Sequence, residues 1–345
     1  MKRRNFIKTA VISSLGSFAL NSAEAKDQND PVRAGTFKMA VLNCQNVNGG
    51  AGLAIVMQTP HGKTWLFDTG TGGFSTPKGT LDPQVYNCGR DTIFPYLKKE
   101  GIKEIEGLLV SHGHGDHMGG LEWILKNVPV RNLYDSGYRF PGVDPAAHTQ
   151  NEVSVHLRLL KEYAERHPGH YFEITKGAKL DWDPDLKVAV LSPPKEFFKE
   201  LPNPNRMKRD TPIHHLLNAN SLAIQIKHGK NTFLIAGDIQ EDYLRKRLWP
   251  ILTDEEKKCD VCILPSHGIH SIKEEAEATR PKIAVASVWN PWAKSALAWR
   301  VYKEVGAEVY ATGIDGNIEI LSDGEHLSVK TEKVRSKNDN INSKK

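Results

Sequence analysis

The chain of 345 residues has little of three features that often reveal a protein's class. It contains four cysteines, too few for a disulfide-rich scaffold. After the first 25 residues, no segment is apolar over the roughly 20 residues that cross a bilayer. The net charge of +5 comes from the ends, because residues 1–25 carry a surplus of three positive charges and residues 326–345 a surplus of four, which leaves −2 between them. A basic surface for nucleic acid is therefore absent from the expected folded part, and we expect no stable nucleic-acid binding.

The remaining composition is that of a globular protein. Apolar residues make up 39% of the chain and charged residues 25%, as in folded domains rather than disordered or fibrous chains. A chain of this length buries roughly three quarters of its unfolded surface, so it builds a full core without disulfide cross-links. We expect one domain over residues 34–329 and a flexible basic tail over residues 330–345.

The first 25 residues have the pattern of an export signal. Arg3 and Arg4 precede Phe-Ile-Lys, residues 9–20 are mildly apolar, and a small-x-small cleavage pattern ends at Ala25. The arginine pair resembles a bacterial twin-arginine signal, which exports folded proteins. We therefore predict transient contact with the twin-arginine export machinery, cleavage near Ala25, and a periplasmic or secreted location.

The cysteines form two pairs along the chain. Cys44 and Cys88 could form a disulfide, which the sequence alone does not decide. Cys259 and Cys262 have the spacing of a metal-binding knuckle, but no second Cys-x-x-Cys accompanies them. They fall in a strand-like run, in which residues three apart face opposite sides. We therefore expect them to be core cysteines rather than metal ligands.

Strands and helices follow one another in two successive sets. The first set runs from a strand at 36–43 to an amphipathic helix at 149–167, and the second from a strand at 186–191 to a strand at 317–321. The stretch 193–212, rich in proline and charge, is expected to be a long loop. The repeated order is typical of two sheets packed face to face with helices outside. We therefore predict an α/β fold, a four-layer αββα sandwich of two similar halves.

The clearest chemical signal is the segment Ser111–Gly120. It contains His112, His114, Asp116 and His117 in the order H-x-H-x-D-H. The segment follows an apolar strand, and its glycines allow a tight turn that brings these side chains together. Imidazole and carboxylate groups are the ligands of zinc in hydrolytic sites. The sequence therefore predicts a metal centre at this turn, and the alternative is a solvated, histidine-rich turn.

This motif resembles the hallmark of the metallo-β-lactamase superfamily, and the resemblance covers nearly the whole chain after the signal. Asp68 matches an aspartate that orients the histidine turn, Asp238 a carboxylate that bridges two metals, and His267 the last histidine of the family. Each of these three segments alone is more often ordinary turn chemistry. Their order and spacing beside the H-x-H-x-D-H motif favour the family.

Within the superfamily, the chain is most similar to the hydrolase-like domain of the DNA-uptake protein ComEC and to related extracellular proteins. The supporting segments are Leu191–Pro194, Asn218–Ala223, Gly237-Asp238, Ala286–Asn290 and Ala311–Gly316. The chain departs from that subgroup at His114, where an acid is frequent, at Ser266, where a histidine is common, and near Lys294, where another histidine often stands. The first departure favours a full metal pair, while the third leaves a substrate contact undefined.

The resemblance implies two divalent ions per chain, expected to be zinc, although another divalent metal would suit the same residues. The implied ligands are His112 and His114 for the first ion, Asp116, His117 and His267 for the second, and Asp238 between the two.

A third-motif histidine is missing from this set. In the family it lies near the position of Leu217 and Asn218 in this chain. His214 and His215 stand a few residues earlier, where we expect loop residues, and are weak candidates for a ligand. His156 is expected on the polar face of a helix.

The implied activity is hydrolysis by a metal-bound hydroxide, with Asp116 as the acid–base group. By similarity to the ComEC-like subgroup, the expected substrate is a small molecule with a phosphodiester or phosphoryl-ester bond. A carboxylic ester, lactone or β-lactam would use the same ligands and is the second hypothesis. A metal-binding domain without turnover is the third, because the third-motif histidine is missing. The loops 138–148 and 193–212 are expected to select the substrate.

Overall fold

The computed structural model describes residues 35–44, 52–73, 85–143, 152–200, 212–239, 247–289 and 298–335. Outside these ranges lie the predicted export signal over residues 1–25, residues 144–148 and 201–211 of the two expected substrate loops, Lys294, and residues 336–345 of the predicted tail. Within the described part of the chain, every helix is too short or too polar to cross a membrane.

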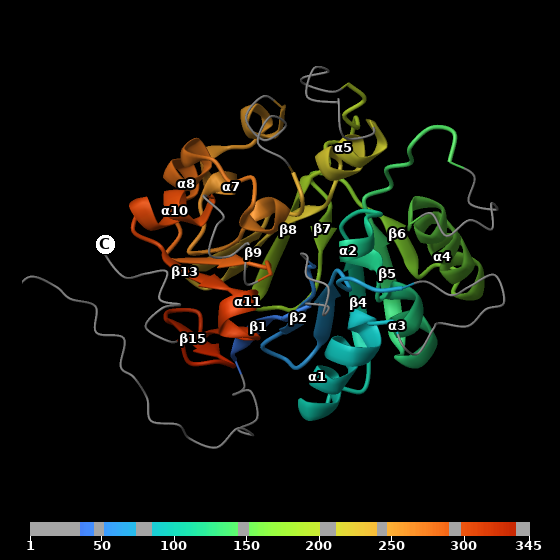
Figure 1. Cartoon of the computed structure of the whole chain (residues 1–345), viewed down its shortest axis with the longest axis horizontal. Coiled ribbons are helices and arrows are strands. Elements are labelled where there is room, and N and C mark those ends of the chain that lie inside the picture. Colours follow the sequence, from blue (N-terminus) through green and yellow to red (C-terminus); the bar gives the residue numbers. More distant parts are fainter. Residues whose placement is uncertain are drawn as a thin grey trace, which may run out of the picture. The chain divides into compact units, whose positions relative to one another are not determined.

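Two β-sheets form the centre of the described chain (Figure 1). The first sheet has the strand order β15-β14-β1-β2-β3-β4-β5-β6. Its strands are β1 (Phe37–Val41), β2 (Ile55–Gln58), β3 (Thr64–Phe67), β4 (Ile105–Val110), β5 (Val130–Asp135), β6 (Tyr171–Glu173), β14 (Ile318–Ser322) and β15 (Leu327–Thr331). The strands from β3 to β6 are parallel, and the others pair antiparallel.

The second sheet repeats this plan. Its strand order is β13-β12-β11-β10-β9-β8-β7. Its strands are β7 (Lys179–Leu180), β8 (Leu186–Ser192), β9 (Ala223–His228), β10 (Asn231–Ile235), β11 (Val261–Ile263), β12 (Ile283–Ala286) and β13 (Glu308–Ala311). The strands from β10 to β13 are parallel, and those from β7 to β10 are antiparallel. Each sheet therefore joins an antiparallel side to a parallel side, as two similar halves would.

The alternation of side chains along the strands builds the layers. Phe37, Met39 and Val41 of β1 belong to the apolar cluster between the sheets, together with Ile224 of β9 from the second sheet. Ala40, between Met39 and Val41, belongs instead to the cluster on the outer face of the first sheet. Successive residues of a strand point to opposite faces, so one apolar strand supplies two layers of the core.

Helices cover the two outer faces. The apolar cluster outside the first sheet includes residues of α1 (Phe94–Lys99), α3 (Leu121–Asn127) and α4 (Glu152–Arg166). The cluster outside the second sheet includes residues of α5 (Pro212–Ala219), α8 (Lys273–Thr279) and α10 (Ala298–Glu304). Shorter turns are η1 (Gly89–Ile93), α2 (Gly115–Met118), η4 (Trp249–Ile251), α7 (Asp254–Lys257), η5 (Pro265–Gly268) and α11 (Thr312–Asp315). The predicted four-layer αββα sandwich is confirmed.

Two regions have more regular structure than the sequence predicted. The expected loop at 193–212 leads into α5, because Pro212 occupies the start of a helix, where its missing N–H costs nothing. His214 and His215 therefore lie on a helix, and their expected place in a loop was wrong. Strand β15 continues to Thr331, and Arg335 pairs with the buried carboxylate of Asp315, so the beginning of the predicted tail is ordered.

The second cysteine pair also differs from expectation. Cys259 lies before β11 rather than within it, so the two residues do not face opposite sides of one strand. Both belong to the apolar cluster outside the second sheet, and a hydrogen bond with Cys259 together with burial raises the pKa of the Cys262 thiol well above its usual value. The prediction of buried core cysteines is confirmed, whereas the predicted separation of their side chains was wrong.

The strand ends position the candidate site. Asp68 follows β3, and Ser111–Gly120 follows the parallel neighbour β4. Asp238 follows β10, and His267 follows its parallel neighbour β11. Because parallel strands end at the same edge of a sheet, each sheet brings two of these segments together there.

Candidate metal centre

The histidine turn is held against the loop after β3. His117 O accepts hydrogen bonds from the backbone N–H of Thr69, at 2.6 Å, and from its hydroxyl, at 3.1 Å. Gly119 N–H donates to Gly70 O at 2.9 Å. A Cβ at Gly119 would overlap the backbone of Thr71 and Gly72, so only glycine permits this close approach.

Asp68 fixes the start of the turn and the ring of His117. One carboxylate oxygen accepts from the Ser111 backbone N–H at 2.6 Å, and the other accepts from the Ser111 hydroxyl at 2.7 Å. The second oxygen also lies 2.7 Å from His117 Nδ1. Because Nδ1 faces Asp68, His117 presents Nε2 to the site, the arrangement in which a carboxylate orients a metal-binding histidine.

The sheet ends bring four of the predicted ligands together, which we call the inner group: Asp116, His117, Asp238 and His267. His117 Nε2 lies 3.2 Å from His267 Nε2 and 3.2 Å from Asp238 Oδ1. His267 Nε2 lies 3.3 Å from Asp116 Oδ2 and 3.6 Å from Asp238 Oδ2. Asp238 thus presents one oxygen to each of the two histidines.

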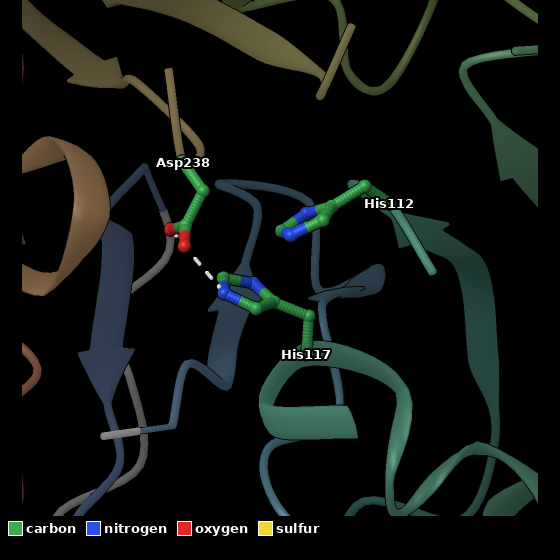
Figure 2. A group of neighbouring side chains, drawn as sticks. All are labelled: His112, His117 and Asp238. Atoms are coloured by element: carbon green, nitrogen blue, oxygen red, sulfur yellow. Dashed lines mark ion pairs between the residues drawn. The ribbon is translucent and has the colours of Figure 1, made fainter. Parts of the chain in front are cut away.

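These spacings fit a metal ion. A tetrahedral zinc site with metal–nitrogen distances of about 2.0–2.1 Å has edges of about 3.3–3.4 Å between its donor atoms. The separations of 3.2, 3.3 and 3.6 Å in the inner group cluster around that edge. Asp116, His117 and His267 form one set of donors close enough for one ion. His117, Asp238 and His112 form another, and Figure 2 shows these three side chains pointing toward one another.

His112 and His114 supply a separate pair of nitrogens. His112 Nε2 lies 2.9 Å from His114 Nδ1, and His112 Nδ1 lies 2.9 Å from the Ser111 hydroxyl. His267 has a similar partner, since its Nδ1 lies 3.0 Å from the Ser287 hydroxyl. Each of these partners leaves the opposite ring nitrogen of His112 and His267 directed into the site.

The charges of the site favour a cation. Burial opposes a positive charge on His117, but the carboxylates of Asp238, Asp68 and Asp116 together raise its pKa well above the usual value. Burial lowers the pKa of His112 well below the usual value and that of His114 to about 4. The three carboxylates around His117 place negative charge in the site, which a bound cation would balance. Because their pKa values are low, His112 and His114 are neutral near pH 7, the form in which imidazole binds metal.

The backbone at the last histidine is unusual. Ser266 and His267 both have positive φ, 47° and 59°, and Asp68 has a φ of 57°. A non-glycine residue in this region costs of order 1–3 kcal/mol and persists where the surroundings hold it. The Ser266 hydroxyl donates to Asp238 O at 3.1 Å, and Ser266 N–H donates to Gly237 O at 3.1 Å. The loop of His267 is therefore tied to the loop of Asp238.

A second set of donors lies outside the first, which we call the outer group: His114, Glu152 and His214. His214 Nδ1 lies 2.9 Å from His114 Nε2 and 3.7 Å from Glu152 Oε1, and Glu152 Oε2 accepts from Gly115 N–H at 2.8 Å. The side chain of His214 is 48% exposed and that of Glu152 30%. His214 faces the nitrogen of His114 that points away from His112, whereas Glu152, the first residue of α4, carried no sequence signal.

Asn218 occupies the place where the third-motif histidine was expected. It lies one helical turn after His214 on α5, so the two residues share a face of that helix. Asn218 is buried, and its Oδ1 has no hydrogen-bond partner among the described residues. The chain beyond it is fixed at two points of the site, since Leu222 N–H donates to Ser111 O and Asp238 N–H donates to the Ser221 hydroxyl.

His156 was expected on the polar face of a helix, and this expectation was wrong. It lies on α4 but is only 3% exposed, because it packs beneath the histidine turn. A Cβ at Gly113 would lie 2.8 Å from His156 Nδ1. The ring of His156 therefore packs against the backbone of the turn at Gly113, between His112 and His114.

Comparisons with known proteins agree with these observations. The family described as "Metallo-beta-lactamase superfamily" matches residues 47–288. Recombination protein 2 of Haemophilus influenzae is 27% identical over 247 residues, which are 70% of this chain and 24% of that protein. ComE operon protein 3 of Bacillus subtilis is 24% identical over 244 residues, 69% of this chain and 27% of that protein.

A shorter match is to hydroxyacylglutathione hydrolase of Chromohalobacter salexigens. It is 30% identical over 78 residues, 23% of this chain and 29% of that protein. In each of these three cases, the match spans only about a quarter of the relative's own length.

Proposed function

Since the chain belongs to the metallo-β-lactamase superfamily, whose members are mostly metal-binding hydrolases, we propose that it is a two-metal hydrolase of phosphodiesters or phosphoryl esters. Its relatives Recombination protein 2 and ComE operon protein 3 confirm the predicted resemblance to the ComEC-like group. Zinc is the proposed metal.

The observation that carries the proposal is the position of Asp238. Its Oδ1 lies 3.2 Å from His117 Nε2, and its Oδ2 lies 3.6 Å from His267 Nε2. His112, which we assign to the other ion, belongs to one set of donor atoms with His117 and Asp238, so proposed ligands of both ions surround this carboxylate. A carboxylate surrounded in this way suits two ions, because it can offer one oxygen to each. Asp116, His117 and His267 would hold one ion, His112 and His114 would hold the other, and Asp238 would bind both.

Two bound dications supply the central chemistry, because they acidify water and balance negative charge that develops in an acyl or phosphoryl transition state. The chain's own groups hold and orient the reactants. The side chain of Asp116 is 37% exposed, whereas those of His117, His267 and Asp238 are 8% exposed or less. Asp116 is therefore the carboxylate of the inner group that reaches substrate, where it accepts a proton from water or returns one to the leaving group.

Asn218 is the proposed third donor for the first ion. His214 approaches His114 at Nε2, whereas Nδ1 of His114 is the nitrogen beside His112. An ion shared by His112 and His114 would therefore be held by the Nδ1 nitrogen of His114, whereas His214 faces Nε2 of the same ring. Asn218 lies further along the same face of α5 and carries a buried carbonyl oxygen without a partner among the described residues. An amide oxygen is a weaker zinc ligand than imidazole and suits harder cations.

The two-ion arrangement favours a phosphorus centre. Two ions held by these residues would balance the negative charge on the oxygens of a phosphoryl transition state, the chemistry that two-metal sites supply in phosphatases and nucleases. A carboxylic ester, lactone or β-lactam is the second candidate, and the match to a protein named hydroxyacylglutathione hydrolase supports a carboxylic substrate. A metal-binding domain without turnover is the third candidate, because Asn218 stands where the third-motif histidine was expected.

A substrate panel on the metal-loaded chain separates these candidates. Hydrolysis of bis-p-nitrophenyl phosphate well above that of nitrocefin and a set of lactones is expected. The reverse preference would replace the phosphoester proposal with the carboxylic one. Full metal content without hydrolysis of either class of substrate would support the third candidate, a metal-binding domain without turnover.

We also propose export through the twin-arginine pathway, on the basis of Arg3 and Arg4 in the sequence. The machinery reads the guanidinium pair, so replacing both by lysine should stop export. Normal accumulation of the double variant outside the cytoplasm would indicate another route.

A further inference from the structure

A pair of thiols lies beneath the loop that carries Asp68. Cys44 Sγ and Cys88 Sγ are 2.9 Å apart, within about 1 Å of the 2.05 Å bond of a disulfide. The two residues are 44 positions apart in the sequence, and their exposed fractions are 2% and 0%. Two buried sulfur atoms so close together, from distant parts of the chain, are placed for a covalent bond.

The backbone packs closely around the sulfur atoms at two glycines. Gly70 has a φ of 65°, and a Cβ at Gly70 would overlap both sulfur atoms. A Cβ at Gly52 would lie 3.2 Å from that of Cys44. The backbone therefore closes over the sulfur pair at two glycines.

The same loop connects the thiols to the histidine turn. Cys88 N–H donates to Thr71 O at 2.8 Å, and Gly119 N–H donates to Gly70 O at 2.9 Å. Thr69 N–H donates to His117 O at 2.6 Å. Residues 68–71 are thus held between the sulfur pair on one side and the turn on the other.

We propose that Cys44 and Cys88 form a disulfide that fastens the Asp68 loop beneath the histidine turn. The bond forms by exchange with an external disulfide, either of a protein oxidant or of oxidised glutathione. One thiolate attacks that disulfide and releases one thiol, and the second thiolate then attacks the mixed disulfide and releases the other thiol. Two protein thiols are oxidised, one external disulfide is reduced to two thiols, and one S–S bond joins Cys44 to Cys88.

Burial decides when the exchange takes place. Thiols that are 2% and 0% exposed do not meet an oxidant in the closed fold, so in a chain that is exported already folded the bond forms when this region opens. Once formed, it closes a loop of about 44 residues and stabilises the fold by restricting the unfolded chain. Disulfides of this kind persist in oxidising compartments, such as the one that the predicted export signal would reach.

The second pair provides a matched control within the same chain. Cys259 and Cys262 are also buried and in contact, but only two residues separate them, and both belong to the apolar cluster on the outer face of the second sheet. Cross-linking across so short a loop restricts the unfolded chain little. The proposal therefore concerns Cys44 and Cys88 alone.

The test uses the full chain refolded in a glutathione redox buffer. After unfolding in N-ethylmaleimide without reductant, we expect alkylation of Cys259 and Cys262 only, and a linked peptide pair that contains Cys44 and Cys88. Reduction should lower the melting temperature by roughly 5–10 °C in the wild type and in the variant with both Cys259→Ser and Cys262→Ser. In the variant with both Cys44→Ser and Cys88→Ser, reduction should leave the melting temperature unchanged.

Alkylation of all four cysteines, or a link between Cys259 and Cys262 instead, would overturn the proposal. So would a melting temperature of the wild type that reduction does not change. Because the readouts are peptide masses and a melting temperature without added metal, they do not depend on the proposed hydrolase activity. If a serine variant fails to fold, the peptide masses of the wild-type chain decide the question.

Discussion

The inner and the outer group of donors differ in how firmly the fold holds them. In the inner group, a hydrogen bond with Asp68 orients His117, and a hydrogen bond with Ser287 orients His267. The loops of Asp238 and His267 are also hydrogen-bonded to each other. In the outer group, the side chains of His214 and Glu152 are 48% and 30% exposed, and they meet through one long ion pair of 3.7 Å. Buried, doubly supported side chains are suited to hold ions, whereas the outer ones are suited to adjust or to contact what enters the site.

Asp238 should give the largest effect, because we propose that its carboxylate binds both ions. Asp238→Asn keeps the shape and removes the charge, so we expect metal affinity to fall at least 100-fold at both positions and hydrolysis to fall with it. Asp68→Asn should cost about 10–100-fold and retain some metal, because Asp68 acts through His117. Metal titration of both variants at one pH is the measurement.

Asp254→Asn is the matched control for these two variants, since that carboxylate is 94% exposed and should change nothing. Wild-type metal content and turnover in Asp238→Asn would mean that Asp238 is only a turn residue.

His114 tests whether the two ions are separate. His114→Ala should remove the first equivalent of metal preferentially and leave the second, because Asp116, His117 and His267 form a set of their own. Metal analysis after dialysis checks the stoichiometry, with His326→Ala, whose side chain is 85% exposed, as control. Two retained equivalents would exclude His114 as a ligand.

Asn218 and His214 lie one helical turn apart on α5, and variants of the two test which of them is a ligand of the first ion. Asn218→Ala should lower the affinity for the first ion about 10-fold or more. Asn218→His should raise the zinc affinity of that site, because imidazole is a better zinc ligand than an amide. His214→Ala should change metal affinity less than Asn218→Ala does. Calorimetric zinc titration of the three variants measures the order, and the reverse order would make His214 the ligand.

The smallest effect is expected at a pair remote from both groups. His61 Nδ1 lies 2.8 Å from Asp183 Oδ1, and this hydrogen bond raises the pKa of His61. A raised pKa stabilises the fold below the unfolded value of about 6.5, and the gain disappears as the pH rises through the folded value. His61→Asn should therefore lower the melting temperature slightly at pH 5.5 and not at pH 8.5. An equal loss at both pH values would show that the charge does not matter.

The sequence predicted the layers well and the outer group poorly, for a physical reason. The strand signals at 36–43 and the apolar run before Ser111 are local patterns, and they predict where the strands lie and where the histidine turn begins. His214 and Glu152 come from α5 and α4, whose meeting at His114 depends on how the two helices pack. The proline that suggested a loop starts α5 instead.

The same limit explains the cysteines. Cys44 and Cys88 are 44 residues apart, and no local pattern gives their distance. The short spacing of Cys259 and Cys262 was misleading, because Cys259 precedes the strand that was expected to separate them.

We propose that two ions share Asp238, and anomalous diffraction from zinc-loaded crystals of the full chain can show both ions and their ligands. Two peaks are predicted, one among Asp116, His117 and His267 and the other beside His112 and His114, with Asp238 bonded to both. A single peak, or a peak held by the outer group of His114, Glu152 and His214 with Asp238 unbonded, would contradict the account.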